Sequence, residues 1–474
     1  MHIHFTRRDF IAGVGALGVC SYLPQTVLAK NNYDVIVVGS GAGGFTAAIR
    51  AAENGAKVLL LEANSWTGGA SRVATGIFGC AGHPIQKALG FTTTPEDLYK
   101  LYISVASATK TKADAEVARI LADGAIGAAD WLASLGVEWS TQKAQKFFLN
   151  IKAGHRLGEF LIDCLEKKAI SLGVELRTNN RVTDLLTDNG RIVGIRSETP
   201  NGNVSVRAPA VVLATGGFEA NPEMIATYIG NGWEKAGVYC TPTNRGDGQR
   251  MAEKIGVQLA DMQVMKANPT IHVSQGNKYN LISAVRAGAI AVNKAGMRFM
   301  NETGGYYESL KIWSLPEKRA WLIFGETTVT ADPRLARLVT AGSIIRGQSI
   351  SELAKKTGIN AESLEKTVAH YKELVKTGKD TDFGRGSLKN VFDGELFAAS
   401  FSPMIQGTFG GIKTNTQTQA MRPDGSVYAG LYAVGECAAS GLRGVNPQTA
   451  NVVFGSIAGR NAVRYAKKIE GEGL

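Results

Sequence analysis

The stretch YDVIVVGSGAGGFTAAIRAAENGAKVLLLE, residues 33–62, decides how this chain begins to fold. Residues 33–38 are a short apolar run, which is typical of a buried parallel strand. Residues 45–55 follow as a helical stretch that Gly55 ends, and 57–62 are a second apolar run. The stretch therefore predicts a complete strand–turn–helix–strand unit.

The turn inside this unit carries Gly39, Gly41, Gly43 and Gly44, in the spacing GxGxxG. Glycines at these positions let the backbone approach a pyrophosphate, and the N-terminus of the helix that follows offers positive partial charge. Glu62 ends the second strand, where a carboxylate accepts hydrogen bonds from ribose hydroxyls and disfavours a 2′-phosphate. The unit predicts a dinucleotide site but does not choose between NAD and FAD.

The strand and helix pattern of this fold is interrupted in the middle of the chain and resumes in its last part. Residues 114–136 and 155–172 are predicted to be amphipathic helices, and 174–199 to be strands. From about residue 263 to 407 the apolar runs are short and turn signals are frequent, after which strand and helix patterns resume. These patterns predict an α/β protein. Its Rossmann-like dinucleotide-binding domain spans 30–262 and 408–474, with an inserted α+β capping (clamp) domain at 263–407.

The N-terminus has the features of an export signal. Arg7 and Arg8 precede an apolar run that is too short to span a bilayer, and the small-residue site ending at Ala29 suits cleavage. The pattern TRRDFI resembles a twin-arginine signal, the export route of proteins that fold around a cofactor before crossing the membrane. Residues 1–29 are therefore predicted to be removed, leaving a periplasmic protein without stable membrane insertion.

Composition narrows the classes of partner and cofactor. The net charge of +11 comes from scattered basic residues, so nucleic-acid binding is not expected. A cationic face for an acidic redox partner or an anionic substrate is the more economical interpretation, and a merely soluble surface is the alternative. No metal site, covalent haem or iron–sulfur cluster is expected, because the cysteines beyond residue 29 are far apart and form no CxxC or CxxCH.

Four later segments select FAD by resemblance. WTGGASRVATG at 66–76, ATGGF at 214–218, NRGDG at 244–248 and LYAVGEC at 431–437 resemble the flavoprotein superfamily of fumarate reductases and 3-ketosteroid dehydrogenases. The resemblance covers essentially the whole chain beyond residue 29. It implies an FAD-binding domain that holds FAD non-covalently.

The resemblance also implies which residues meet the cofactor. Ser71 and Gly76, with the adjacent Ala70 and Ile77, would line the isoalloxazine ring, and Val182 would meet the adenine through its backbone. Asp247 and Glu436 would hold the ribityl–ribose region. The helix entered near Asn451 and Val452 would point its N-terminus at the flavin N1/O2 edge and stabilise the anionic reduced flavin.

The substrate-handling residues of soluble fumarate reductases are mostly replaced in this chain. By the resemblance, two of their histidines fall on Asn268 and Gly407, and their substrate-clamping arginine falls on Pro447. The glutamate of their proton relay falls on Ser283, whereas the relay arginine survives as Arg286. Without these two histidines and this arginine, the chain lacks the charge that would bind the two carboxylates of a dicarboxylate. Fumarate is therefore not the expected substrate.

Tyr306 falls where the reductases carry the arginine that protonates substrate. In 3-ketosteroid dehydrogenases the equivalent loop has a tyrosine four residues after a glutamate, which is the spacing between Glu302 and Tyr306. A phenol transfers a proton to or from carbon, especially if Arg286 lowers its pKa. Tyr306 and Arg286 are therefore predicted to be catalytic. A packing role for Tyr306, and a shift of the register to Tyr307, are the alternatives.

Arg443 falls where the reductases carry a histidine beside the substrate. It is predicted either to receive a carboxylate or carbonyl oxygen of the substrate, or to pair with an acid at the surface.

These features together predict an exported FAD-dependent reductase of an activated C=C bond in a small enoate or enone. Its electrons would come from a c-type cytochrome or a quinol-linked protein, since the chain has no haem motif of its own. Two alternatives are a dehydrogenase that introduces a C=C bond into a ketone or steroid-like substrate, and a flavin-binding protein without turnover.

Overall fold

The computed structural model describes residues 27–28, 33–74, 77–108, 114–152, 154, 156–272, 278–303, 306–439 and 447–471. Only the backbone is described at 27–28, 106–108, 269–272, 278–280, 282, 306–308 and 469–471. Gly76, Arg443 and most of the predicted signal peptide lie outside the described residues. Among the described helices, none is long and apolar enough to cross a membrane.

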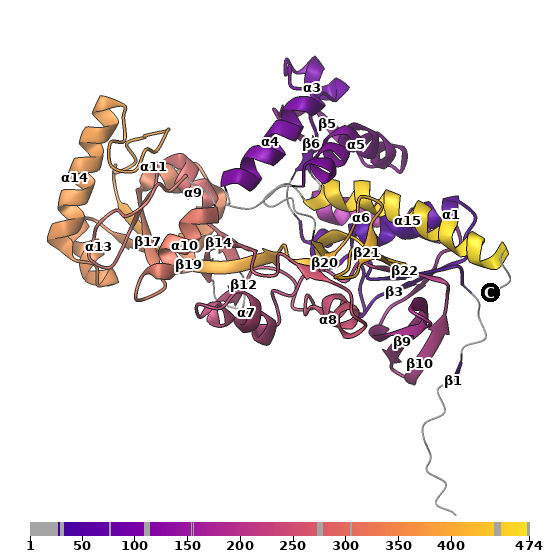
Figure 1. Ribbon diagram of the computed structural model, residues 1–474. Helices are drawn as coiled ribbons and strands as arrows, with labels where there is room; N and C mark the ends of the chain where they lie inside the picture. Colours follow the sequence, from indigo (N-terminus) through magenta and orange to yellow (C-terminus); the bar gives the residue numbers. More distant parts are fainter. Residues whose placement is uncertain are drawn as a thin grey trace, which may run out of the picture.

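The largest sheet is built around the predicted strand–turn–helix–strand unit (Figure 1). Five neighbouring strands are parallel and lie, from the edge strand β7 inward, in the order β7 (Glu175–Arg177), β3 (Val58–Leu61), β2 (Val35–Val38), β11 (Ala210–Leu213) and β22 (Val427–Ala433). Next to β22, β9 (Arg191–Thr199) pairs in parallel and is itself antiparallel to β8 (Arg181–Asp188) and β10 (Gly202–Arg207). β21 (Gln419–Met421) pairs antiparallel with β22, and β1 (Val27–Leu28) pairs parallel with β10. This part of the chain is called the sheet domain below.

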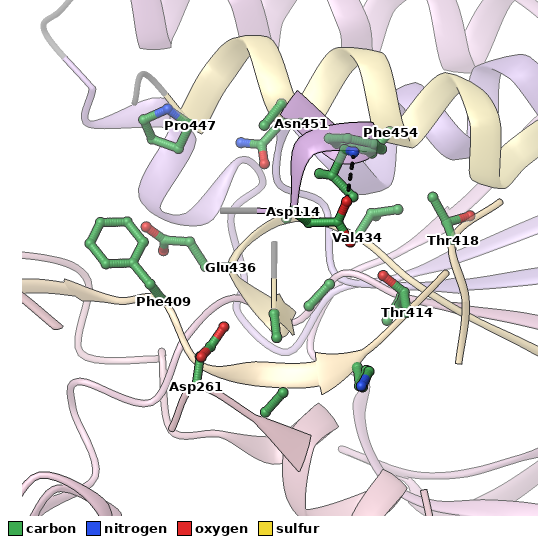
Figure 2. Close-up of a pocket in the computed structure, with 18 of the residues that line it drawn as sticks. Asp114, Asp261, Phe409, Thr414, Thr418, Val434, Glu436, Pro447, Asn451 and Phe454 are labelled. Carbon is green, nitrogen blue, oxygen red and sulfur yellow. Dashed lines mark hydrogen bonds between the residues drawn. The ribbon is translucent and has the colours of Figure 1, made fainter. Parts of the chain in front are cut away.

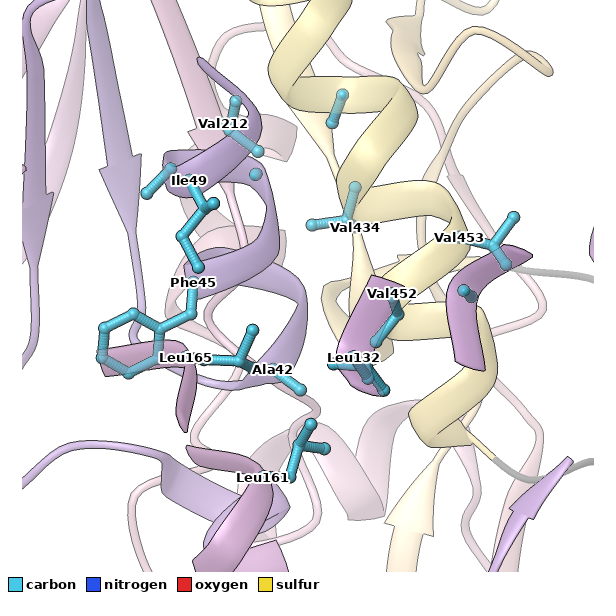
Figure 3. Packing of buried hydrophobic residues seen from close by; sticks show 14 of the residues in the cluster. Ala42, Phe45, Ile49, Leu132, Leu161, Leu165, Val212, Val434, Val452 and Val453 are labelled. Carbon is cyan, nitrogen blue, oxygen red and sulfur yellow. The ribbon is translucent and has the colours of Figure 1, made fainter. Parts of the chain in front are cut away.

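Alternate residues of the central strands face opposite sides of the sheet. On β2, Val35 and Val37 belong to a core that includes α1 (Ala42–Glu53), α6 (Leu157–Ser171) and α15 (Pro447–Gly471), and Figure 3 shows part of it. Ile36 and Val38 pack into a second core with the strands β8–β10 and with α8 (Asp247–Lys254). Burial on both faces explains why this strand is apolar throughout.

A second sheet forms the cap, at the left of Figure 1. It contains β12 (Gly237–Val238), β14 (Met265–His272), β15 (Lys278–Asn280), β16 (Ile290–Val292), β17 (Ala320–Gly325), β18 (Ile345–Gly347) and the long β19 (Leu396–Thr408). The helices of this region are α9 (Ile282–Ala287), α10 (Tyr306–Ser314), α11 (Glu326–Thr330), α12 (Pro333–Thr340), α13 (Ile350–Thr357) and α14 (Ala361–Thr377). The cap has a core of its own, in which Phe324, Tyr371 and Phe397 are buried.

The segment before residue 263 also contributes to the cap. β12 pairs with β19, and the ring of Trp233 in the 3₁₀ turn Trp233–Lys235 stacks on Trp313 of α10 with centroids 4.3 Å apart. Phe218 and Met224, near and within α7 (Pro222–Tyr228), pack in the same cluster. A domain boundary at residue 263 would therefore assign β12 to the sheet domain, although β12 belongs to the sheet of the cap.

Two smaller sheets complete the described fold. One joins β4 (Phe78–Gly79), β5 (Trp139–Gln145) and β6 (Phe148–Ile151), near α2 (Gly69–Arg72), α3 (Pro84–Ala88), α4 (Pro95–Ala108) and α5 (Ala115–Ser134). The other joins β13 (Leu259–Ala260), β20 (Gly411–Lys413) and β23 (Ala438–Ala439), where the chain leaves and re-enters the sheet domain.

Candidate functional site

The glycine turn between β2 and α1 is packed so tightly that side chains cannot replace its outer glycines. Gly39 has φ +102°, and a Cβ there would lie 2.3 Å from the carbonyl oxygen of Ala214 on the neighbouring strand's end. A Cβ on Gly44 would lie 1.9 Å from the carbonyl oxygen of Gly39. At Gly41 the nearest atom is Ser71 Oγ at 3.7 Å, so this middle glycine leaves its backbone open to a ligand.

Glu62 braces this turn. Its Oε2 accepts hydrogen bonds from Ser40 Oγ at 2.6 Å and Ser40 N at 3.1 Å, and its Oε1 accepts from the backbone and side-chain nitrogens of Asn64 at 2.9 Å. The side chain of Glu62 is buried at the end of β3. Supporting the turn is a function of Glu62 beyond its predicted contact with ribose hydroxyls.

The 66–77 segment lies against the same turn. Ser71, in α2, accepts a hydrogen bond through Oγ from the first N–H group of α1, that of Ala42, at 3.1 Å. Ala70 is half-buried in α2, and Ile77 is half-buried just before β4. The structure thus brings Ser71 to the helix N-terminus at which the pyrophosphate is expected.

A cavity of about 270 Å³ opens beside the glycine turn, between the starts of α5 and α15 (Figure 2). A Cβ on Gly43 would lie 3.4 Å from Val434 and 3.7 Å from the carbonyl oxygen of Asn451, and both of these residues line the cavity. Glu436 lines it as well, and so does Pro447, the first residue of α15. The cavity therefore brings predicted flavin residues together with Pro447, on which the sequence analysis predicts that the substrate-clamping arginine of the reductases falls. Val452 is fully buried in the core between α1 and α15.

The charged side chains around this cavity are mostly acidic. Among its described lining residues, Asp114, Asp261 and Glu436 are carboxylates and Lys413 is the one cation. Asp114 also caps α5, because its Oδ1 accepts from the backbone nitrogens of Glu116 at 3.0 Å and Val117 at 3.1 Å. Sequence reasoning missed Asp114, Asp261 and Lys413, which lie in different segments without a shared motif.

Asp247 and Val182 border a different cavity, of about 280 Å³, beside β8 and α8. Both carboxylate oxygens of Asp247 accept from the guanidinium group of Arg181 at 2.9 Å, and Arg250 adds a contact of 2.7 Å. Burial opposes ionisation of Asp247, but these arginine hydrogen bonds outweigh it and lower its pKa. The structure thus pairs Asp247 with Val182 and separates it from the cavity that Glu436 lines.

Two acidic residues that the sequence analysis did not connect, Glu219 and Glu436, both lie near the end of β19. Glu219, directly after ATGGF, is buried, and the charge of its carboxylate acts on that of Glu436. Burial raises the pKa of Glu219, and burial together with the charge of Glu219 raises the pKa of Glu436. The sequence offered one signal for Glu219: it is an acidic residue that follows a buried strand and two glycines.

The predicted catalytic residues of the cap are only partly placed. Arg286 is exposed near the end of α9, and Tyr306 begins α10, where only the backbone is described. Glu302, just before Tyr306, has its carboxylate buried against Arg298 and Arg385, a structural role that the motif spacing did not reveal. The catalytic roles of Tyr306, Arg286 and Arg443 stay predictions.

The described residues fit FAD. The glycine turn leaves an open backbone at Gly41, next to the N-terminus of α1. Gln249 is fully buried and donates through Nε2 to the carbonyl oxygens of Gly216 at 3.0 Å and Glu436 at 3.4 Å. Its Oε1 has no partner among the described residues, so it can accept a hydrogen bond from a bound group.

Comparison with known proteins agrees with this geometry. The family model described as "FAD binding domain" matches residues 34–453. The chain is 33% identical over 465 residues to a fumarate reductase (cytochrome) of Shewanella frigidimarina, covering 94% of this chain and 80% of the relative. It is 31% identical over 464 residues to a urocanate reductase of Eggerthella lenta, covering 91% and 75%.

The open conformation of a flavocytochrome c3 fumarate reductase has a similar structure, with a TM-score of 0.80 at 30% identity, over 92% of this chain and 79% of that one. The chain therefore belongs to the FAD-binding family and is an FAD-dependent oxidoreductase of the superfamily that contains fumarate reductases and 3-ketosteroid dehydrogenases.

Proposed function

We propose that this protein is an exported, periplasmic reductase that saturates the C=C bond of a small enoate or enone other than fumarate. The observation that carries the proposal is the charge of the cavity beside Glu436. Its described lining residues include three acidic residues and one lysine, and by the resemblance Pro447 replaces the arginine with which fumarate reductases clamp a substrate carboxylate. A dianion such as fumarate would be repelled by the carboxylates of Asp114 and Asp261, whereas a substrate with one carboxylate or carbonyl needs one polarising group.

Different residues of the chain would bind the cofactor, donate the proton and polarise the substrate. Gly39, Gly41, Gly43, Gly44, Ser71 and Glu436 would hold FAD, which supplies a hydride when bound and reduced. Tyr306 donates a proton to the α-carbon of the substrate, and Arg286 supplies a positive charge to the proton relay. Arg443 or backbone N–H groups polarise the activating carbonyl, where negative charge develops.

Electrons would arrive from a separate protein, since export removes the enzyme from cytoplasmic NADH. A c-type cytochrome or a quinol-linked protein is the proposed donor, and one relative in the comparisons is named a cytochrome-type fumarate reductase. The net charge of +11 suits an acidic donor surface. Residues 263–407 are proposed as the capping domain that closes over the substrate, with β12 contributing to its sheet.

An anaerobic assay with reduced viologen tests the proposal. The purified protein is offered monocarboxylic enoates, enones and fumarate, and viologen oxidation is followed. Turnover of an enoate or enone, with fumarate at least 10-fold slower (about 1.4 kcal/mol), is the expected result. Faster turnover of fumarate overturns the substrate assignment.

The same preparation is then offered saturated ketones with an artificial electron acceptor. Oxidation of a ketone without reduction of any enoate would establish the alternative, a dehydrogenase that introduces a C=C bond. Absence of turnover in both directions, with FAD bound and reducible, would leave a flavin-binding protein.

A further inference from the structure

The cavity beside Glu436 has an apolar side between two helices. At the start of α5, Val117 and Leu121 are one helical turn apart and therefore lie on the same face of the helix. The lining residues of α15 share one face of their helix in the same way, and they are Pro447, Ala450, Asn451 and Phe454. Most of these side chains are hydrocarbon, so the space between the two helices suits an apolar group.

Another wall comes from β20 and the loop after it, across the cavity from α15 in Figure 2. On β20, Ile412 is fully buried in the core behind the strand. Because side chains alternate along a strand, the next residue, Lys413, faces the other way and lines the cavity. Thr414, Asn415 and Thr418 of the loop continue this wall. The cavity thus has a polar, cationic side as well as an apolar one.

Hydrogen bonds hold the loop after β20 in place. Asn415 Oδ1 accepts from the backbone nitrogens of Gln417 and Gln419, both at 3.0 Å. Asn461 of α15 donates through Nδ2 to the carbonyl oxygen of Gln417 at 3.1 Å and to its Oε1 at 2.9 Å. The loop is therefore fixed against α15, and a ligand does not have to order this wall when it binds.

Lys413 is the one cation among the described lining residues of this cavity. Its ammonium group has no hydrogen-bond or ion-pair partner in the part of the chain that the structure describes. The acidic lining residue Asp114 is already engaged, because its Oδ1 caps α5. An unpaired ammonium group at the wall of a preformed cavity offers a strong, charge-assisted hydrogen bond to one carboxylate of a ligand.

Asn451 also indicates that the cavity takes a bound group. Its residue is 8% exposed, and its side chain lies so close to the cavity wall that a Cβ on Gly435 would be 3.2 Å from Asn451 Oδ1. No hydrogen bond joins this side-chain amide to the other described residues. Because buried polar groups nearly always have a partner, FAD or the substrate is expected to supply one here.

We propose that Lys413 binds the carboxylate of the substrate and that the apolar faces of α5 and α15 receive its hydrocarbon part. The substrate is then a monocarboxylic enoate with an apolar β-substituent. This inference rests on the proposed function and names the substrate class of the same cavity. A second carboxylate on the ligand would lie against Asp114 or Asp261, with no second cation among the described lining residues.

Isothermal titration calorimetry of the oxidised holoenzyme measures binding without turnover. The ligands are 3-phenylpropanoate, propanoate without the ring, succinate with a second carboxylate, and the neutral ketone 4-phenylbutan-2-one. Because its ring buries apolar surface, 3-phenylpropanoate should bind at least about 10-fold more tightly than propanoate, and also more tightly than succinate. Affinity for 3-phenylpropanoate that does not exceed the affinity for propanoate and for succinate overturns the proposal.

Substitutions of Lys413 test the carboxylate contact. Lys413→Met keeps an apolar stem but removes the ammonium group, so 3-phenylpropanoate should bind about 10-fold or more weakly. The ketone carries no charge and should lose much less affinity, whereas a structural disturbance would weaken both ligands alike. Lys413→Arg keeps the charge and should retain most of the affinity for the acid.

Lys143→Met is the matched control, because Lys143 is exposed on β5 and does not line the cavity. It should bind every ligand as the wild type does. Unchanged affinity for 3-phenylpropanoate in Lys413→Met, or equal losses for the acid and the ketone, overturns the role of Lys413.

This test and the viologen assay fail independently. If the protein reduces enoates while Lys413→Met binds 3-phenylpropanoate as the wild type does, the role of Lys413 is wrong and the proposed function stands. If 3-phenylpropanoate binds through Lys413 but no enoate is reduced, the proposed function is wrong and the cavity is a monocarboxylate site.

Discussion

Arg298 and Glu302 are joined by two hydrogen bonds of 2.9 Å, from Arg298 Nε to Glu302 Oε1 and from Arg298 Nη2 to Oε2. Their side chains are 4% and 0% exposed. Arg385 adds a bond of 3.2 Å to Glu302 Oε2, and Asp380 Oδ2 accepts from Arg298 Nη2 at 2.9 Å. This buried network of Arg298, Glu302, Asp380 and Arg385 ties the loop before Tyr306 to the body of the cap, and Arg385 also donates to Val285 O beside Arg286.

Replacing Glu302 by Gln should destabilise the protein strongly. The substitution leaves the guanidinium groups of Arg298 and Arg385 buried. Asp380 is then the one carboxylate of this network, which in the wild type has two. Removing one partner of a buried ion pair costs about 3–5 kcal/mol. Chemical denaturation followed by circular dichroism measures this loss. Glu362→Gln is the control, because its ion pair with Lys366 is exposed and its removal should change the unfolding midpoint little.

Asp380 should make part of the stability depend on pH in the acid range. Burial opposes its ionisation, but the hydrogen bonds and charge of Arg298 and the nearby backbone N–H groups outweigh it, and its pKa falls from 3.8 to about 2. A folded-state pKa below the unfolded value contributes stability above pH 3.8, and this stability is lost as pH falls towards 2.

Asp380→Asn should therefore be less stable than wild type at neutral pH and lose less stability between pH 3.8 and about 2. Thermal unfolding measured across this range checks the slope. Asp188→Asn, at an exposed turn, should retain the wild-type slope. An identical slope in Asp380→Asn and wild type would show that Asp380 is not ionised against Arg298.

Tyr306→Phe should keep the fold and the bound FAD, because it removes one hydroxyl and retains the ring. If that hydroxyl donates the proton to substrate, turnover of an identified enoate should fall by roughly 10²-fold or more. Reduction of the flavin by an artificial donor should be unaffected, since that step needs no proton from the substrate site. Stopped-flow reduction and steady-state viologen oxidation separate the two steps.

Tyr307→Phe is the matched control for this experiment. Activity within a few-fold of wild type in Tyr306→Phe, combined with a large loss in Tyr307→Phe, would move the proton donor to Tyr307. Little change in either variant would mean that both tyrosines have packing roles and that the proton comes from Arg286 or water.

The purified mature protein should be yellow and should release FAD when it is precipitated by acid or heat. The glycine turn and Glu436 provide contacts for FAD by hydrogen bonding and helix charge alone. Chromatography of the supernatant identifies the flavin. Colour retained in the washed precipitate would show covalent attachment, and FMN in the supernatant would contradict the dinucleotide site.

Arg7→Lys combined with Arg8→Lys should leave the precursor in the cytoplasm. The double substitution keeps the positive charge but removes the planar guanidinium groups that a receptor for paired arginines recognises. Flavin fluorescence and immunoblotting of fractionated cells locate the protein. The control is Lys30→Arg, just beyond the predicted cleavage site, which should be exported normally.

The sequence by itself determined the sheet domain's nucleus. Residues 33–62 form β2, the glycine turn, α1 and β3 as predicted, because strand, turn and helix signals act over a few neighbouring residues. The strands predicted over 174–199 and the helix predicted near Asn451 are likewise local patterns, and the structure has β7, β8 and β9 in the first stretch and α15 in the second. Family motifs spread along the chain then identified FAD, since each motif keeps its own local spacing.

Only the tertiary structure decided which distant side chains meet. Glu219 and Glu436 both lie beside the end of β19, Glu219 at Thr408 and Glu436 at Gly407, and no local spacing encodes that placement. Glu302, which in the sequence only marks the position of Tyr306, is a buried ionic centre because the chain returns at Asp380 and Arg385. Burial and charge depend on such long-range packing, so the protonation of a carboxylate is a property of the fold and not of its motif.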